Sequence, residues 1–305
     1  MRESIERLTS NLSRAIVGKD QEIQLVLTAL FSGGHVLLED VPGVGKTLLA
    51  KSLARSIDGQ FKRVQCTPDL LPTDVTGTNI WNPQTGEFEF LQGPVFGNVL
   101  LTDEINRATP RTQSALLEVM EEHQVTTDGV SRPVPDPFFV IATQNPVEYQ
   151  GTFPLPEAQM DRFSISLSLG YPTEPEELQM LQRLQSTEAS KPIGPCISLE
   201  EVQQLRQACA QVMVKDNVQR YILGLVRATR EHSDIRLGAS PRGTVALYRT
   251  SQALAFLRGR DFVIPDDVKE LAIAVLAHRL IPSSGHRAKT LVQQLLDSVP
   301  NSVAA

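Results

Sequence analysis

The segment from Asp40 to Thr47 constrains the fold of this 305-residue chain more than any other. It reads Asp-Val-Pro-Gly-Val-Gly-Lys-Thr; the apolar run Val36–Leu38 precedes it, and an apolar-faced helical pattern continues to Ala54. A strand, a glycine-containing loop and a helix N-terminus bind phosphate, because free backbone N–H groups and the positive end of the helix dipole point at the anion. In the pattern G-x-x-x-x-G-K-[ST], the lysine reaches the β- and γ-phosphates and the final hydroxyl ligates Mg²⁺. The segment therefore predicts a phosphate-binding loop within an α/β fold.

Asp40 departs from this pattern, whose first glycine would stand at the same position. Gly43 still supplies a residue that tolerates a tight turn. The alternative is an ordinary solvated loop with a chance Gly-Lys-Thr, which the flanking strand and helix disfavour. The candidate nucleotide-binding residues are therefore Pro42, Gly43, Val44, Gly45, Lys46, Thr47 and Leu48.

Length and composition predict a soluble globular protein with one large and one smaller domain. Hydrophobic residues make up 41% and charged residues 21% of the chain, and the formal net charge is −6. An acidic balance provides no global basic field for nucleic acid or anionic lipid. The charged N-terminus carries no secretory signal, and His278 and Arg279 interrupt the apolar stretch Leu271–Ile281. We therefore expect a cytoplasmic protein without a membrane span.

The cysteines and histidines predict no metal site beyond nucleotide-bound Mg²⁺. Cys66, Cys196 and Cys209 are widely spaced and form no C-x-x-C pair, which is typical of reduced, buried thiols. The five histidines also lack the spacing of metal ligands.

From Ile23 to about Tyr171, short apolar runs alternate with helical patterns, which is typical of a parallel α/β sheet. We expect residues 1–171 to form this core. Two β-hairpins are expected within it, around Asn82–Gly86 and around Asp128-Gly129. The expected sheet strands are Val36–Leu38, Phe61–Cys66, Val99–Thr102, Phe138–Thr143 and Ser164–Leu169.

The pattern changes after Tyr171-Pro172. Residues 172–197 are expected to be a linker with a short helix around Pro175–Gln185, and residues 198–305 a helical domain. Ser198 and Glu201 predict a capping box at the start of the first helix of that domain. Ser240-Pro241 predicts another helix start and places Arg242 in its first turn. The expected helices run from Ser198 to about Val214, Asn217 to Glu231, Ser240 to Arg258 and Pro265 to Arg279.

An acidic pair follows the apolar run Val99–Thr102. Asp103 and Glu104 would lie at the carboxyl edge of the sheet, where parallel α/β folds bind ligands. There Asp103 would help to hold Mg²⁺ and Glu104 would activate the attacking water, two roles that phosphoryl transfer requires. The alternative is a strand that runs into an acidic loop.

Two further positions have weaker signals. Asn145 follows another apolar strand and could contact the γ-phosphate or the lytic water, although an Asn-Pro pair is usually a turn. Arg162 precedes the Ser164–Leu169 strand, where a surface ion pair is the ordinary role of an arginine. Its guanidinium would suit an arginine finger, which stabilises the charge that develops on the transferred phosphate.

In this order, the motifs resemble those of AAA+ ATPases, and longer strings narrow the resemblance to the MoxR family. The resemblance covers nearly the whole chain. It implies a P-loop AAA+ core, with a parallel β-sheet sandwiched by helices, followed by a smaller all-helical lid domain. The two hairpins fall where this family's helix-2 insert and pre-sensor-1 insert would lie. The strings are Glu39–Thr47, Gly93–Phe96, Asp103–Ala108, Gln113–Glu118, Ala142–Pro146 and Gly238–Arg242.

The resemblance also implies roles for individual residues. Lys46 belongs to the Walker A motif, and Thr47 and Asp103 are implied to hold Mg²⁺ beside ATP. Glu104 completes Walker B. Asp40 looks like a variant that the family tolerates.

Three catalytic roles outside these motifs follow in the same way. Asn145 matches sensor 1, Arg162 the arginine finger and Arg242 sensor 2. The finger is implied to act on the neighbouring subunit's nucleotide, whereas Arg242 could act in either subunit. Val17 and Gly18 resemble the segment that contacts adenine, although an apolar residue and a turn glycine are ordinary features.

By resemblance, the chain is expected to be a ring-forming ATPase, hexameric, with chaperone-like remodelling or maturation of protein complexes. A protein client and a partner with a von Willebrand factor A domain are implied. One alternative is the ATPase subunit of a metal chelatase, which carries the same inserts. Others are a nucleic-acid motor or activator, which the acidic balance disfavours, and a nucleotide-dependent binding module with little turnover.

Overall fold

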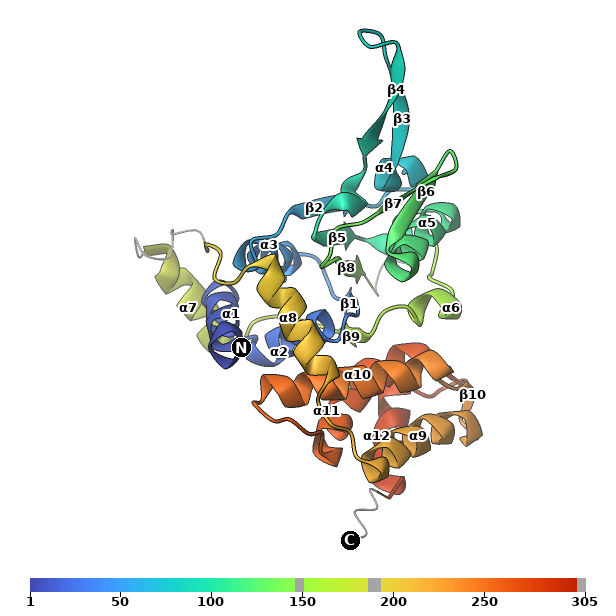
Figure 1. Ribbon diagram of the computed structural model, residues 1–305. Coiled ribbons are helices and arrows are strands. Elements are labelled where there is room, and N and C mark those ends of the chain that lie inside the picture. The colour runs from blue at the N-terminus through green and yellow to red at the C-terminus, as the bar shows by residue number, and fades with distance from the viewer. Residues whose placement is uncertain (146–150, 186–192, 301–305) are drawn as a thin grey trace.

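A computed structural model describes residues 1–145, 151–185 and 193–300 of the chain (Figure 1). Its central sheet has five parallel strands in the order β2-β5-β8-β1-β9. All five strands predicted from the sequence are present, with ends shifted by one or two residues. They are β1 (Val36–Glu39), β2 (Phe61–Gln65), β5 (Val99–Asp103), β8 (Phe139–Gln144) and β9 (Ile165–Leu167).

Each inner strand is a continuous apolar run because both faces of the sheet are covered by helices. Alternate residues enter two separate cores: Val36 and Leu38 pack on one face of β1, and Leu37 packs on the other. The first core includes residues of α1, α2 and α3 together with residues of the C-terminal helices, and the second includes residues of α5. The four labelled helices are α1 (Arg2–Ala15), α2 (Asp20–Phe31), α3 (Lys46–Ser56) and α5 (Pro110–Glu122). The predicted parallel sheet between helical layers is confirmed.

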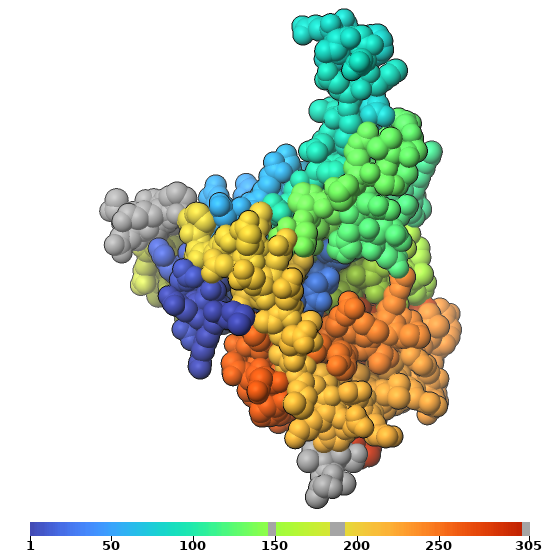
Figure 2. Space-filling view, in the orientation of Figure 1, coloured from blue at the N-terminus to red at the C-terminus, as the bar shows by residue number. Residues whose placement is uncertain are grey.

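Two hairpins project from the sheet end that carries α5 (Figures 1 and 2). Both were predicted from their turns; at Asp128-Gly129 both φ angles are positive, as tight hairpin turns require. The hairpins touch where Asn79 donates a 2.5 Å hydrogen bond to Asp128. Their strands are β3 (Gly77–Asn82) with β4 (Glu87–Gln92), and β6 (Gln124–Thr127) with β7 (Val130–Pro133). The short helices α4 (Pro72–Thr76) and α6 (Glu157–Met160) complete this part of the chain.

The C-terminal part is helical and packs beneath the sheet on α2 (Figure 1). The predicted capping box is present, with Ser198 N donating to Glu201 Oε2 at 2.9 Å. Two features were not predicted: α12 and a short antiparallel pair, β10 (Ile235–Leu237) with β11 (Ile281–Pro282). No helix of the described segments is both long and apolar enough to cross a membrane. The helices are α7 (Glu174–Gln185), α8 (Leu199–Ala210), α9 (Asp216–Glu231), α10 (Pro241–Leu257), α11 (Pro265–Leu276) and α12 (Ala288–Ser298).

Candidate functional site

The loop between β1 and α3 has the backbone of an anion cradle. Gly43 and Gly45 have φ angles of 89° and 99°, which glycine adopts without strain, and a Cβ added at either would meet open space. Helix α3 begins at Lys46, and no side chain caps its N-terminus. Its first-turn N–H groups are thus directed at the space beside the loop. Lys46 is buried and donates from Nζ to the carbonyl oxygen of Asp40 at 3.1 Å. The residues present fit a bound phosphate chain.

Thr47 and Leu48 follow in the first turn of α3, with the Leu48 side chain exposed. Pro42 is exposed, and Val44 is partly buried against the first core. The predicted loop residues are thus brought together around the start of one helix.

Asp103 and Glu104 end β5 at the same edge of the sheet. Glu104 has φ 55° and ψ 52°, a left-handed conformation that costs a non-glycine residue about 1–2 kcal/mol. The hydroxyl of Thr143 on β8 accepts from Glu104 N at 2.9 Å and donates to Asp103 Oδ1 at 2.7 Å. One buried hydroxyl therefore holds both acidic residues in place.

The two carboxylates also have partners on the neighbouring strand β2. Arg63 binds Asp103 Oδ2 at 2.7 Å, and Gln65 donates to Glu104 Oε2 at 3.0 Å. Arg107 lies 3.3 Å from the same oxygen of Glu104. No pattern in the sequence identifies Arg63 and Gln65, because their proximity to the acidic pair depends on the pairing of β2 with β5.

Cys66 directly follows these β2 residues. Burial, with smaller contributions from the charges of Asp103 and Glu104, raises the pKa of its thiol to about 12. The thiol therefore stays protonated at neutral pH and is no nucleophile. This outcome agrees with the predicted role of a small buried side chain.

Asn145 is buried at the end of β8, the strand between β1 and β5. It thus shares the carboxyl edge with the phosphate loop and the acidic pair. The described residues contain no cluster of three or more His, Cys, Asp or Glu side chains that could hold a metal ion. The oxygens of Thr47 and Asp103 fit Mg²⁺, which binds few protein ligands and keeps water and phosphate oxygens as the others.

Val17 and Gly18 lie in the turn between α1 and α2. Gly18 has φ 71°, and a Cβ added there would lie 1.9 Å from Oε1 of Glu176 on α7. The neighbouring Lys19 donates to the carbonyl oxygen of Tyr171 at 3.3 Å. The structure therefore places this pair against the connection that follows β9.

Arg162 and Arg242 lie at the opposite, amino edge of the sheet. Two residues beyond Arg162, Ser164 donates from Oγ to the carbonyl oxygen of His35, which directly precedes β1, at 2.8 Å. Arg162 and Arg242 both form ion pairs with the carboxylate of Glu121 at the end of α5, the Arg162 pair at 3.1 Å. The sequence contained no signal that singled out Glu121.

The two edges are well separated. From His35 to Asp40 the chain advances five residues along β1, about 16 Å at ~3.3 Å per residue. Arg162 and Arg242 therefore cannot contact a phosphate in the loop of their own chain. Apart from Val17 and Gly18, the predicted site residues of this chain form two groups at opposite edges of the sheet.

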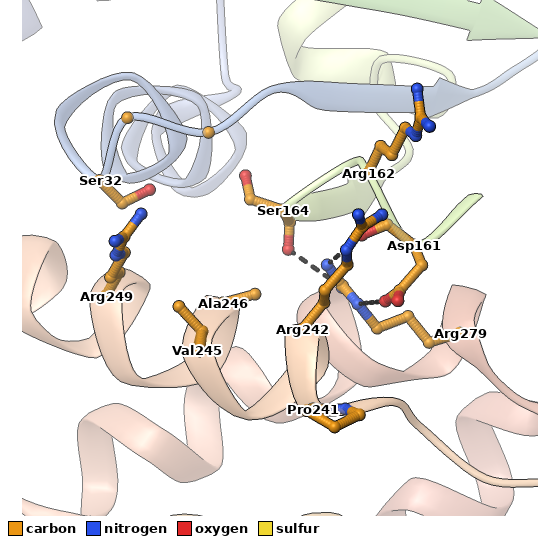
Figure 3. A pocket seen from close by; sticks show the side chains of 12 residues that line it. Ser32, Asp161, Arg162, Ser164, Pro241, Arg242, Val245, Ala246, Arg249 and Arg279 are labelled. Carbon is orange, nitrogen blue, oxygen red and sulfur yellow. Dashed lines mark hydrogen bonds and ion pairs between the residues drawn. The ribbon is translucent and has the colours of Figure 1, made fainter. Parts of the chain in front are cut away.

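A cavity of about 340 Å³ opens beside the two arginines, between α10 and the start of β9 (Figure 3). Arg162, Arg242, Arg249 and Arg279 all contribute to its wall. Arg279 is already neutralised, because its Nε lies 2.8 Å from Oδ1 of Asp161. Arg162 and Arg242 share the single carboxylate of Glu121, so together with Arg249 they leave this surface with a net positive charge suited to an anion.

Comparisons with known proteins agree with this geometry. Residues 35–165 match the ATPase family associated with various cellular activities (AAA), and residues 227–298 match the AAA lid domain. The chain is 48% identical over 298 residues to the uncharacterized protein YeaC of Bacillus subtilis, covering 96% of this chain and 93% of that protein. It is 44% identical over 287 residues to Chaperone MoxR1 of Mycobacterium tuberculosis, covering 91% and 76%.

Two further similarities extend over almost the whole chain. Protein MoxR of Methylorubrum extorquens is 30% identical over 330 residues, covering 100% of this chain and 96% of that protein. The crystal structure of a putative ATPase from Cytophaga hutchinsonii superposes with a TM-score of 0.91 at 39% identity. That comparison covers 98% of this chain and 95% of the other.

Proposed function

The chain belongs to the MoxR family of AAA+ ATPases, and we propose that it hydrolyses ATP in a ring oligomer to remodel a protein client. The observation that carries the proposal is the division of the predicted catalytic residues between two edges of one sheet. The phosphate loop, Asp103, Glu104 and Asn145 lie at one edge, and two arginines lie at the other. A single subunit therefore supplies two incomplete halves of an ATP site.

At the carboxyl edge, each residue has a defined task. Lys46 would leave the carbonyl oxygen of Asp40 and bind the β- and γ-phosphates. The Glu104 carboxylate would accept a proton from the water that attacks the γ-phosphate, and Asn145 would orient that water. Thr47 and Asp103 would hold Mg²⁺, whose charge would neutralise that of the phosphates.

At the amino edge, Arg162 and Arg242 would stabilise the charge that develops on the nucleotide of the adjacent subunit. Their common ion pair with Glu121 supports a joint role for the two arginines, and the distance from the loop of their own chain supports action in trans. A closed ring makes every such site equivalent, because each subunit presents both edges to its neighbours. We propose a hexamer.

We further propose that the protein acts in the cytoplasm on a protein client, with a von Willebrand factor A-domain protein as partner. The printed name of Chaperone MoxR1, a relative at 44% identity, supports a chaperone-like role. The net charge of −6 supports a protein client over a nucleic acid. Residues 1–171 would form the nucleotide-binding core, residues 172–197 the linker and residues 198–305 the lid.

Paired single variants test the shared site. Glu104→Gln should abolish hydrolysis and retain ATP binding, and Arg162→Ala should also be inactive. Mixed in equal amounts, the two variants should regain activity, because about a quarter of the interfaces then combine an intact Glu104 with an intact Arg162. Arg227→Ala, which removes an exposed ion pair with Glu231, is the matched control and should change nothing.

Each outcome is decisive for one part of the proposal. Unchanged turnover in Glu104→Gln would refute the catalytic role of that residue. If mixing restored no activity, the role of Arg162 in trans would be refuted.

A further inference from the structure

Asp40 stands where the general phosphate-loop pattern has its first glycine, and its side chain is buried against a distant segment. The side chain is 4% exposed. Its Oδ1 accepts from Ser168 Oγ at 2.6 Å and from Gly170 N at 3.0 Å, and its Oδ2 accepts from Leu169 N at 2.6 Å. None of the ion pairs of the described residues includes Asp40. The carboxylate thus accepts hydrogen bonds from three neutral donors just after β9.

The backbone explains why a glycine is not needed at this position. The positive φ angles of the loop fall at Gly43 and Gly45, and Asp40 is not among the described residues with positive φ. A side chain at position 40 therefore introduces no strain. Instead, it connects the start of the phosphate loop to residues 168–170.

The backbone of Asp40 also contacts the predicted catalytic residues. Its carbonyl oxygen accepts from Lys46 Nζ at 3.1 Å, and its N–H donates to the carbonyl oxygen of Gln144, next to Asn145, at 3.2 Å. A phosphate that draws Lys46 away would remove a hydrogen bond from Asp40. Phosphate bound at the loop would therefore change the contacts of the residue that also binds the segment after β9.

That segment leads toward the lid and past the predicted adenine contact. Tyr171 follows Gly170 and accepts from Lys19 at 3.3 Å through its carbonyl oxygen. Thr173 N then donates to Glu176 Oε2 at 2.6 Å, and Glu176 lies against Gly18. A shift at residues 168–170 would thus pass directly to the start of α7.

We propose that Asp40 is a positioning residue that couples phosphate binding at Lys46 to the connection formed by residues 168–176. The proposal rests on the proposed function, since it requires that ATP binds this loop. Asp40 itself touches no phosphate. It makes the connection to the lid respond to the presence of nucleotide.

Hydrogen exchange of backbone amides, with and without ATP and Mg²⁺, tests this in a Glu104→Gln background. In the parent chain, ATP should slow exchange both in the loop, residues 43–48, and in residues 169–176. Asp40→Gly, which restores the general pattern, should speed exchange of the Leu169 and Gly170 amides by at least about tenfold, because both lose their acceptor. In Asp40→Gly, ATP should no longer slow amide exchange at residues 171–176, but it should still slow exchange in the loop, residues 43–48.

Three more variants complete the test. Asp40→Asn keeps one acceptor oxygen and should give an intermediate result. Ser168→Ala removes a single donor and should act in the same direction, even if Asp40→Gly fails to fold. Ser166→Ala is the matched control: its hydroxyl binds Glu39 at 2.8 Å between the same two strands, and its loss should leave residues 169–176 unchanged.

The proposal would be overturned if ATP still slowed amide exchange at residues 171–176 in Asp40→Gly. If Asp40→Gly does not fold, the same result in Ser168→Ala would overturn it. An equal effect of Ser166→Ala would also overturn it. If ATP left residues 43–48 of the parent chain unchanged, the nucleotide site itself would be refuted, and this coupling with it. The two failures are therefore distinguishable.

Discussion

The hydroxyl of Thr143 should decide the geometry of the acidic pair, and Thr143→Val removes it with almost no change of shape. The side chain is fully buried. In the variant, Asp103 Oδ1 loses a donor at 2.7 Å and Glu104 N loses an acceptor at 2.9 Å.

The structure sets the size of the effect. A hydrogen bond to a charged group is worth about 1.5–3 kcal/mol, and a buried N–H without an acceptor costs about 1–3 kcal/mol. Burial of a methyl group in place of the hydroxyl returns about 1 kcal/mol. The free energy of unfolding should therefore fall by about 1.5–5 kcal/mol.

Activity should fall for a separate reason. Glu104 is in a left-handed conformation that costs about 1–2 kcal/mol, and the bond to Thr143 helps to hold it there. Without that bond, the carboxylate would leave its position for part of the time. A loss of about 1.4–2.7 kcal/mol in the transition state corresponds to a fall in kcat of about 10- to 100-fold. The KM for ATP should change little, since the phosphate loop is untouched.

Steady-state ATPase kinetics and urea unfolding of Thr143→Val provide the measurements, and Thr102→Val is the control. Thr102 is also buried, one residue before Asp103, but its hydroxyl has no hydrogen-bond partner among the described residues. The same substitution there should be neutral or stabilising. Equal effects of the two substitutions, or an unchanged kcat in Thr143→Val, would refute the reasoning.

Three further predictions concern other parts of the molecule. Glu121 competes with the neighbouring subunit's nucleotide for Arg162 and Arg242, through two partly exposed ion pairs worth about 0.2–1 kcal/mol each. Glu121→Gln removes both pairs, so the protein concentration that gives half-maximal ATPase activity should fall about 2- to 30-fold. An unchanged concentration dependence would contradict this competition. Burial lowers the pKa of His35 to about 3, so only the unfolded state gains a proton as the pH falls from about 6.5 to about 3, and stability should decline over that window. The urea midpoints at pH 7 and pH 5 should therefore differ less in His35→Gln than in the unsubstituted protein. An equal difference in both proteins would contradict this role of His35. Asp267→Asn should lower the free energy of unfolding by about 2–3 kcal/mol. This is less than the loss expected for a fully buried ion pair, because its partner Arg260 is partly exposed. Thermal denaturation measures the loss, and Asp266→Asn, at an exposed position, is the control and should have no effect.

Local patterns predicted most of the fold because the physical causes are local. The inner strands β1, β5 and β8 appear in the sequence as apolar runs, since both faces are buried, whereas the edge strand β2 has one buried residue, Val64. Helices α8 and α10 begin with recognisable side-chain caps, Ser198 and Ser240. Helix α12 was not predicted; Arg287, at its N-cap, provides no side-chain cap.

The chemistry of the site was likewise readable from short motifs. Gly43 and Gly45, a lysine at the start of a helix and a strand that ends in two acids are local requirements for binding phosphate and Mg²⁺. The family resemblance added roles for Asn145, Arg162 and Arg242, but not their placement.

Only the tertiary structure decided which of these residues meet. The sheet order brings Thr143 and Gln65 to the acidic pair. It places Arg162 and Arg242 at the opposite edge, beside Glu121. It also brings Asp40 into contact with Ser168. Most of these contacts join residues far apart in the chain, so no local propensity encodes them. By itself, the sequence determined that this protein has the groups of an ATP site. The direction and order of the strands determined that these groups lie at opposite edges of the sheet, because the two ends of a parallel strand are too far apart for any side chain to span.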